Sequence, residues 1–371
     1  MVINADDLAR EVVAPGSDGL AAIVARFGDA VVDDGGALNR AALGSIVFAD
    51  PGARRDLERI THPRIAARTG EIIELAPADA IVVHDVPLLV EKHLGPGYHL
   101  VVIVGADEQT RLRRLTQHRG MTEDDVLARM AAQAGDEERR AAADVWLDNS
   151  GTPDDVRDAV DGLWHERLVP YEHNVRHGIR AARSDALVLQ PHDPTWSAQA
   201  ERLLERVRLA FGDAAVTAAH IGSTAVPGLV AKDVIDLQVG VTSLAASDAP
   251  VLLDRLALAG FPRPADAPRA DNAKGGGAWP KRFHGAADPA RPAHIHVREV
   301  GSPGWRWALL FRDWMRADPA AREAYAAEKA RLAAAGLGVS AYAEAKETWF
   351  DEIHSPAEQW AERTGWVAPH A

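Results

Sequence analysis

The chain has 371 residues, with 41 Lys and Arg against 54 Asp and Glu, so its formal net charge is −13 at pH 7. This length predicts two globular domains, and without an apolar run of about 18 residues the chain is not expected to span a membrane. The absence of Cys excludes disulfides and thiolate catalysis, and the acidic surplus argues against a broad nucleic-acid surface.

Strand-like and helix-like segments alternate in the first half of the chain. Apolar runs at 81–84 and 100–104 predict strands, and the patterns at 107–115 and 122–134 predict helices. This alternation is typical of a parallel α/β sheet. A further amphipathic helix is expected at 154–168, and it should end before Pro170.

The second half has a different, α+β pattern. Helices are expected at 197–211 and 249–259, strands at 234–241 and 294–300, and helices again from Trp305 onward. We place the domain boundary near residue 185, which gives domains 1–184 and 185–371. The amino-terminal residues contain no basic apolar leader, so we expect a cytoplasmic protein.

Four separated motifs occur in the first half: Val2–Val13, Thr61–Arg64, His84–Glu91 and Ala143–Asn149. In this order they resemble bacterial dephospho-CoA kinase over residues 1 to about 180. The resemblance implies a P-loop kinase that uses ATP and Mg²⁺ to phosphorylate the ribose 3′-hydroxyl of dephospho-CoA, the last step of coenzyme A synthesis.

The phosphate-binding loop of such kinases is not found in this sequence. Phosphoryl transfer needs backbone amides and a lysine around the ATP phosphates, in the form G-x-x-x-x-G-K-[ST]. None of the lysines here follows a glycine. The resemblance therefore implies a P-loop-kinase-like sheet whose first strand and P-loop are missing. We expect either an impaired or inactive kinase or a recorded start that is too late.

Two further departures from the family concern the acidic motif after its second strand and the lid. The family's Asp-Ala-Asp is Asn4-Ala5-Asp6 here, which leaves Asp6 to accept the substrate hydroxyl proton or position Mg²⁺, unless it only caps a helix. In the segment that matches the family's lid, Asp136 stands where an arginine would meet the phosphates, and this charge reversal would raise the barrier.

The remaining candidate ligands of the kinase-like half are assigned through the resemblance. Each also has a structural interpretation: a surface charge, a helix end, core packing or a turn cap. The residues expected to bind substrate or nucleotide are His62, Arg64, Pro87, Leu88, Arg119, Arg129, Arg139 and Asn149.

Residues 187–367 resemble the GrpB family, a nucleotidyltransferase-like domain of poorly established role. The resemblance rests on His192–Trp196, His220–Leu229, Val234–Asp236, His294–Val297 and Phe311–Asp313. Fusions of the two families occur in actinobacteria.

Nucleotidyl transfer by two Mg²⁺ ions needs a carboxylate pair spaced Asp-x-Asp on a strand. Here the residue two positions after Asp236 is Gln238, which is neutral, so we do not expect that reaction. His294 and His296 should point to one face of a strand, where two core histidines are favoured over a metal site. What remains is a predicted phosphate site made of Gly222, Ser223, Thr224, Lys232, Asp236, Arg282, His296 and Arg312.

Three hypotheses follow for the fused chain. It is a dephospho-CoA kinase by descent, with ATP and dephospho-CoA as small-molecule ligands; or the GrpB-like half binds a nucleotide or CoA-type anion without catalysis; or that half only stabilises the other. We expect no membrane or nucleic-acid partner, and the oligomeric state stays open.

Overall fold

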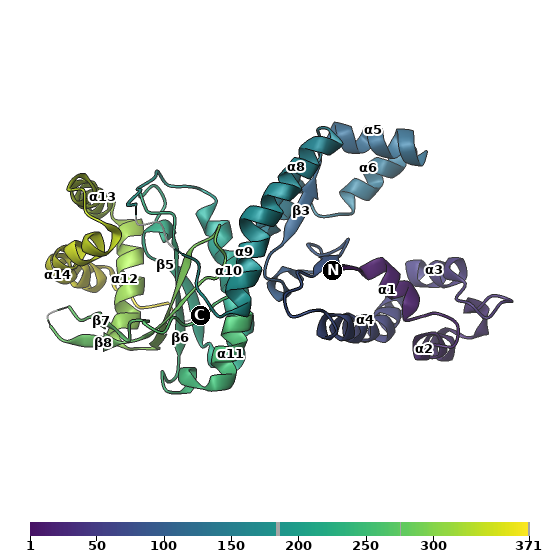
Figure 1. Cartoon of the computed structure of the whole chain (residues 1–371), viewed down its shortest axis with the longest axis horizontal. Helices are drawn as coiled ribbons and strands as arrows, with labels where there is room; N and C mark the ends of the chain where they lie inside the picture. Colours follow the sequence, from purple (N-terminus) through teal and green to yellow (C-terminus); the bar gives the residue numbers. More distant parts are fainter. Residues whose placement is uncertain (183–185, 275, 370–371) are drawn as a thin grey trace. The chain divides into compact units, whose positions relative to one another are not determined.

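The computed structural model describes residues 1–182, 186–274 and 276–369 (Figure 1). The backbone packs into two compact units, Met1–Leu89 and Val90–Ala371. The domain boundary expected between 184 and 185 lies outside the described residues and stays a proposal. Within the described part, we find no helix that combines the length and the apolar character needed to cross a membrane.

The first unit contains a two-stranded parallel sheet and four α-helices. Strand β1 (Val2–Asn4) pairs with β2 (Val83–Asp85), with Asn4 opposite Asp85. The helices pack around a small core of Val13, Ile23, Val31 and Leu43. They are α1 (Ala5–Glu11), α2 (Asp18–Phe27), α3 (Arg40–Ala49) and α4 (Pro51–Glu74).

Helix α4 corrects one structural interpretation of the sequence. His62-Pro63 was a candidate helix end, but α4 continues through Pro63. A proline inside a helix removes one backbone hydrogen bond, which costs about 3 kcal/mol. The packing of α4 against α1, α2 and α3 offsets this loss.

The second unit begins with another parallel pair, β3 (Val102–Gly105) and β4 (Val145–Asp148), so parallel pairing is confirmed in both units. Its first helices are α5 (Glu108–Arg119), α6 (Glu123–Ala131), α7 (Asp136–Ala142), α8 (Pro153–Leu163) and α9 (Val169–Arg176). Side-chain caps begin α5, α6 and α8: Asp107 accepts from the Thr110 amide, Thr122 accepts from the Asp125 amide, and Thr152 forms a capping box with Asp155.

The expected helix end before Pro170 is wrong. A π-helical turn, Trp164–Leu168, joins α8 to α9, and Pro170 lies in the first turn of α9. The wider turn changes the hydrogen-bond pattern where proline cannot donate, so the helix continues.

The rest of the second unit is built on a mixed four-stranded sheet, and the expected α+β pattern is confirmed. The strand order is β5 (Thr217–Ile221), β6 (Ile235–Val241), β10 (Ala293–Glu299) and β9 (Arg282–Gly285). Only the β6–β10 pair within it is parallel. Beside it lies a hairpin of β7 (Ala270–Asn272) and β8 (Ala278–Pro280).

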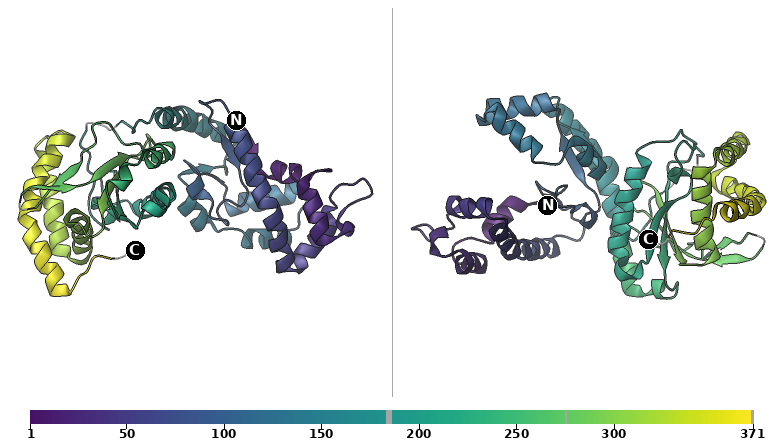
Figure 2. Two further views of the ribbon diagram at one scale, coloured as in Figure 1. Left: turned by 90° about the horizontal axis from the view of Figure 1, so that it is seen from below. Right: turned by 180° about the vertical axis from the view of Figure 1, so that it is seen from behind.

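Helices cover both faces of this sheet (Figures 1 and 2). On one face lie α10 (Trp196–Phe211) and α11 (Pro250–Leu258). On the other lie α12 (Pro303–Ala317), α13 (Pro319–Ala334) and α14 (Val339–Thr364).

Alternation along the strands sorts apolar and polar side chains between these faces. Ile235, Leu237, Ile295 and Val297 enter the core with α10 and α11. Because successive side chains of a strand point to opposite faces, the residues between them, Asp236 and the β10 histidines included, face the α12 side.

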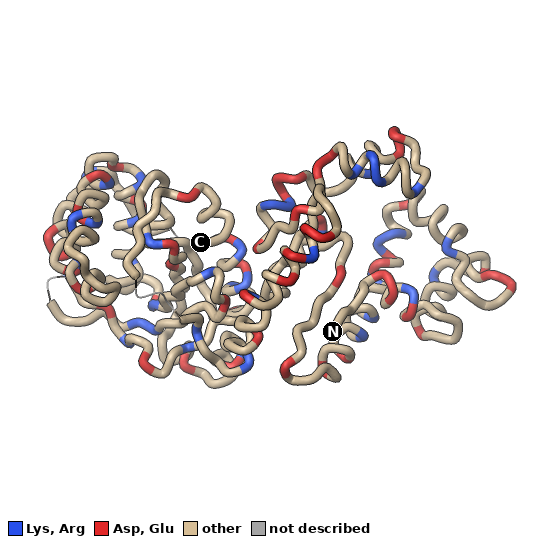
Figure 3. Tube along the Cα trace, turned by 45° about the horizontal axis from the view of Figure 1, so that its top comes forward, with Lys and Arg blue, Asp and Glu red and all other residues tan. Residues whose placement is uncertain are grey.

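Lys and Arg are interspersed with Asp and Glu along the described trace (Figure 3). Many of these charges form pairs close in sequence on exposed helix surfaces, such as Arg10 with Asp7 and Arg331 with Glu328. Exposed pairs of this kind contribute little to stability. The stronger electrostatic interactions in the second unit are therefore the few that are buried.

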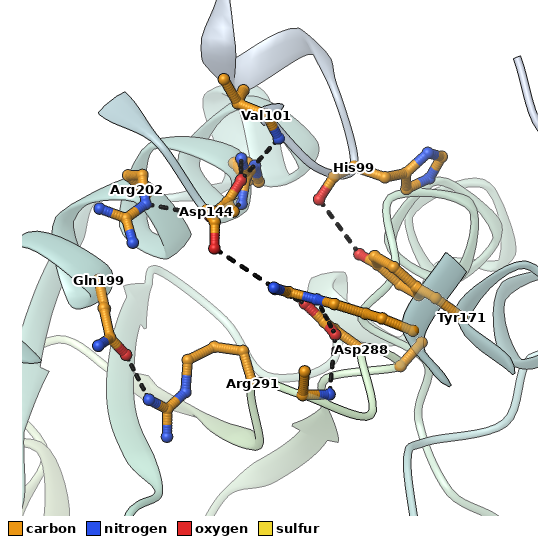
Figure 4. Close-up of polar contacts among 12 residues, drawn as sticks. His99, Val101, Asp144, Tyr171, Gln199, Arg202, Asp288 and Arg291 are labelled. Atoms are coloured by element: carbon orange, nitrogen blue, oxygen red, sulfur yellow. Dashed lines mark hydrogen bonds and ion pairs between the residues drawn. The ribbon is translucent and has the colours of Figure 1, made fainter. Parts of the chain in front are cut away.

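A buried carboxylate, Asp144, connects the β3–β4 pair to α10 (Figure 4). Its Oδ1 accepts from Arg202 Nε at 3.0 Å and Arg206 Nη1 at 3.1 Å, and its Oδ2 accepts from the Val101 amide at 2.8 Å. Burial raises the pKa of Asp144, but hydrogen bonding and charge from Arg206, followed by the charge of Arg202, outweigh it. The pKa therefore lies below its usual value and the carboxyl is ionised at neutral pH.

A second buried pair lies beside the first. Arg167, in the π-helical turn, donates to both carboxylate oxygens of Asp288 at 3.0 and 2.6 Å. From α9, Asn174 donates to the Ala287 carbonyl at 2.8 Å. These contacts hold the α8–α9 helix against the loop between β9 and β10.

Asp144→Asn should destabilise the second unit, because both guanidinium groups lose their buried counter-ion. We expect the free energy of unfolding to fall by about 3 kcal/mol, the order found when one partner of a buried pair is neutralised. Urea unfolding followed by tryptophan fluorescence measures the change.

The matched control is Asp154→Asn, which breaks an exposed pair with Arg157 on α8. It should change the free energy by less than about 0.5 kcal/mol. Equal effects of the two substitutions would contradict the assignment of the buried network.

Candidate functional sites

The first candidate site lies at the carboxyl end of the β1–β2 pair. Asn4 Oδ1 accepts from the amides of Asp6 and Asp7 at 2.9 and 3.2 Å and thereby caps α1. Asn4 Nδ2 donates to Asp85 Oδ2 at 3.2 Å. Parallel strands place functional groups at this edge. The amide that replaces the family's first aspartate thus positions two carboxylates, those of Asp6 and Asp85, of which sequence reasoning identified only Asp6.

The other predicted ligands of the first unit lie on two elements. His62 is exposed on α4, and Arg64 lies two residues further, with Nη1 donating to the Ile60 carbonyl at 2.7 Å. Pro87 and Leu88 follow β2 and are exposed. They are therefore not packed in a core, and their role as a wall for the substrate stays a prediction.

The predicted ligands between 119 and 149 lie on separate elements of the second unit. Arg119 ends α5 and Arg129 lies on α6, both exposed, whereas Arg139 on α7 contacts Gln133 Oε1 at 3.3 Å. Asn149 follows β4, and its carbonyl accepts from Arg114 Nη1 at 2.6 Å.

Asp136, the reversed charge of the lid segment, has a partner that sequence reasoning missed. It lies in the first turn of α7 and pairs with Arg111 at 3.2 Å. A carboxylate is stabilised at a helix N-terminus as well as by the guanidinium. Asp136 therefore has a structural role, and its effect on the transferred phosphate stays a prediction.

A second candidate site lies on the α12 side of the large sheet, where β5 ends and β6 and β10 begin. Asp236 Oδ1 is 2.9 Å from His294 Nδ1 and 3.6 Å from His296 Nε2. Burial raises the pKa of Asp236, but its interactions with His294 and then His296 outweigh it and hold the pKa well below its usual value. Burial lowers the pKa of His296 to about 4, so this imidazole is neutral at pH 7.

The turn after β5 closes over Asp236. Gly222 has φ 71°, and a Cβ there would lie 2.6 Å from Asp236 Oδ2, so only glycine fits. Ser223 hydrogen bonds to Tyr325 of α13. Thr224 is buried, with its hydroxyl 2.9 Å from His220 Nε2.

Three lysines gather around two tyrosines near this turn. Lys329 Nζ lies 4.4 Å from the Tyr325 ring centroid, and Lys346 and Lys232 lie 4.9 and 5.5 Å from that of Tyr342. Burial, followed by repulsion from Lys346 and then Lys232, lowers the pKa of Lys329 to about 6.

Lys329, which donates to the Val230 carbonyl at 2.6 Å, is therefore mostly uncharged at pH 7, and an anion placed among the three lysines would favour its charged form. Sequence reasoning found only Lys232. The others lie on α13 and α14, 97 and 114 residues further along the chain, and no spacing rule links them to the turn.

Two predicted members of the phosphate site differ in placement. Arg312 Nη1 donates to the His220 carbonyl at 3.1 Å, beside the turn. Arg282 pairs in register with Val297, on the α10 side of the sheet, and binds both carboxylate oxygens of Asp248 at 2.8 and 2.6 Å. We therefore leave Arg282 out of the proposed phosphate site.

Gln238, which replaces the second carboxylate of a nucleotidyltransferase, is buried and structural. Its Oε1 accepts from Arg298 at 2.6 Å, and its Nε2 donates to the Trp305 carbonyl at 3.1 Å. A neutral, fully hydrogen-bonded amide offers no ligand for a second ion, so the arrangement opposes two-metal chemistry.

Comparison with known proteins identifies both halves. A dephospho-CoA kinase family model matches residues 1–155, and a GrpB protein family model matches residues 186–355. A dephospho-CoA kinase of Mycolicibacterium paratuberculosis is 46% identical over 99% of this chain and 93% of its own length. One of Mycobacterium tuberculosis is 44% identical with the same coverage.

The kinase-like half also matches shorter relatives. A dephospho-CoA kinase of Streptomyces avermitilis is 51% identical over 164 residues, which are 44% of this chain and 80% of that protein. Full-length similarity to the mycobacterial proteins decides the family: the chain belongs to the dephospho-CoA kinases and carries a second, GrpB-type region.

Proposed function

We propose that this protein is a dephospho-CoA kinase that transfers the γ-phosphoryl group of ATP to the ribose 3′-hydroxyl of dephospho-CoA in coenzyme A biosynthesis. The supporting observation is 46% identity to a dephospho-CoA kinase over 99% of the chain. The division into a kinase domain, 1–184, and a GrpB-like domain, 185–371, is part of this proposal.

Asp6 is the proposed catalytic residue. It lies exposed at the first turn of α1, where its carboxylate can accept the proton of the attacking hydroxyl. The Asn4 side chain accepts from the backbone amide of Asp6 and donates to the Asp85 carboxylate, so both carboxylates lie at the carboxyl end of the β1–β2 pair. Carboxylate oxygens suit Mg²⁺, and Asp6 and Asp85 are the residues that would hold it. When bound, Mg²⁺ offsets negative charge on the transferred group.

We further propose that turnover depends on a phosphate-binding loop that the 371 residues do not contain in the form G-x-x-x-x-G-K-[ST]. Each parallel pair, β1–β2 and β3–β4, has only two strands. Isolated two-stranded sheets are marginal, and three or more strands are needed for independent stability. A strand that carries such a loop would therefore supply both pairing and phosphate contacts.

Fusing the first strand, phosphate loop and helix of a dephospho-CoA kinase to Met1 should raise kinase activity. We expect the fused protein to exceed the 371-residue chain by about 10³-fold or more, since phosphate positioning and charge stabilisation supply most of this catalysis. A coupled ADP-release assay with dephospho-CoA measures it. The control fusion replaces the loop lysine with Met, and equal turnover without the fused segment would contradict the proposal.

Asp6→Asn should lower kcat by about 10²–10⁴-fold with a small effect on the KM for ATP, because the amide cannot take the hydroxyl proton. Asp7→Asn is the matched control: Asp7 is also exposed in the first turn of α1 and donates its amide to Asn4. Both variants are made in the form with the higher turnover. Similar losses from the two substitutions would leave Asp6 without a catalytic role.

A second function is proposed for the GrpB-like domain, the binding of a phosphate-bearing anion. The observation that favours it is the group formed by Lys232, Lys329 and Lys346 around Tyr325 and Tyr342. Ammonium groups that repel one another in partly buried surroundings gain stability from a shared anion. The hydroxyl of Ser223 and the guanidinium of Arg312 lie on neighbouring segments and extend the site.

ATP, CoA and dephospho-CoA are the anions to test by calorimetry on the full chain. Lys346→Met should weaken binding about tenfold, the effect of losing one charge-assisted hydrogen bond, whereas Lys92→Met, an exposed control, should not. The ratio of wild-type to Lys329→Met affinity should rise as pH falls through about 6, because Lys329 gains its charge there. Titration of the ligand affects both affinities equally and so does not change this ratio. If none of the three anions binds, the proposed function is rejected.

A further inference from the structure

We infer that Asp236, His294 and His296 form a binding site for one divalent transition-metal ion. This site differs from two-metal nucleotidyl transfer, whose second carboxylate is absent, and it does not depend on kinase activity.

Strand register brings the three side chains together. His294 is the direct partner of Asp236 across the parallel β6–β10 pair, and His296 lies two residues further on the same face. Asp236 Oδ1, one nitrogen of His294 and one nitrogen of His296 all lie within 4.8 Å of one another. Ligands at about 2.0–2.1 Å from a metal are about 2.9–3.4 Å apart. The observed 2.9 and 3.6 Å are close to this range.

The neighbouring residues hold the ligands in this arrangement. The Phe283 ring packs on both imidazoles, with centroid distances of 5.3 and 5.6 Å. The backbone of Gly222 lies against the Asp236 carboxylate. All three ligands are half-buried, with side-chain exposures of 18, 16 and 29% for His294, His296 and Asp236. Side chains fixed by packing lose little freedom when an ion binds.

Hydrogen bonds alone do not account for the cluster. Only His294 approaches Asp236 at normal hydrogen-bond length, since 3.6 Å for His296 is too long. The outer nitrogens, His294 Nε2 and His296 Nδ1, are buried and have no hydrogen-bond partner among the described residues. Because only one of the two imidazoles is hydrogen-bonded to the carboxylate on which both converge, an ion bound by all three side chains would account for the arrangement.

The ligand set selects the metal class. Imidazole suits Zn²⁺ and Fe²⁺ and carboxylate suits Mn²⁺, whereas Mg²⁺ prefers a shell made of oxygen ligands alone. Three protein ligands leave at least one coordination position open, as in catalytic zinc sites. Lys329 and Lys346 interact electrostatically with Asp236. An anion held by these lysines would complete the coordination of the ion.

The untagged full chain, stripped with chelator, is titrated with Zn²⁺, Mn²⁺ and Mg²⁺ by calorimetry, and bound metal is counted by mass spectrometry. We expect one Zn²⁺ or Mn²⁺ per chain and at least about tenfold weaker Mg²⁺. His296→Gln and Asp236→Asn should each weaken Zn²⁺ binding at least about tenfold and abolish the rise in Tm that the ion produces. The control is His118→Ala, an exposed histidine on α5.

Two readouts keep the inference falsifiable if a variant folds poorly. The Co²⁺-loaded wild-type protein should show the visible absorption of imidazole ligation, and adding ATP should tighten Zn²⁺ binding, since binding of ion and anion is reciprocal. Failure to bind an ion, a Co²⁺ spectrum equal to that of the free ion, or unchanged Zn²⁺ affinity in His296→Gln would each overturn the site. If the chelator-treated protein binds Zn²⁺ but none of the three anions, only the anion proposal is rejected.

Discussion

The second unit depends on one buried carboxylate. Asp144 follows α7 and precedes β4, and it accepts hydrogen bonds from Arg202 and Arg206 of α10 and from the Val101 amide. A buried charge is tolerated only when it is paired and hydrogen-bonded, so α10 and the β3–β4 pair must stay together. The Arg167–Asp288 pair adds a second fixed point. This explains why the strands of the kinase-like segment after residue 90 pack in one unit with the GrpB-like sheet.

The same α10 fixes one face of that sheet, and the other face is thereby left for polar chemistry. Apolar residues at alternate positions of β6 and β10 enter the α10 core, so Asp236, His294 and His296 point toward α12. Helices α13 and α14 bring lysines to the same edge. The carboxylate and two imidazoles carry the proposed cation site and the lysines the proposed anion site, a pairing that would suit phosphate-bearing ligands.

Three residues, two in the kinase-like half and one in the GrpB-like half, differ from the pattern that the resemblances imply, and each has a structural role in this protein. Asn4 has lost the negative charge of the family's aspartate, yet its amide caps α1 and binds Asp85. Asp136 reverses a charge in the lid segment, yet it pairs with Arg111 at a helix N-terminus. Gln238 replaces a metal-binding carboxylate and joins Arg298 to the Trp305 backbone. In each case the local hydrogen bonds are satisfied while the charge needed for phosphoryl chemistry has changed.

The sequence by itself determined the two families, the parallel pairing, the α+β second half and the shared face of His294 and His296, because these follow from motifs and from the two- and 3.6-residue periods of strands and helices. Only the tertiary structure decided that helices run through Pro63 and Pro170, that Arg282 faces away from Asp236, and that Lys329 and Lys346 join Lys232. The physical reason is the same throughout. Periodicity is a local property of the chain, whereas strand register, the packing that offsets a proline and the meeting of distant charges are set by contacts between segments far apart in sequence.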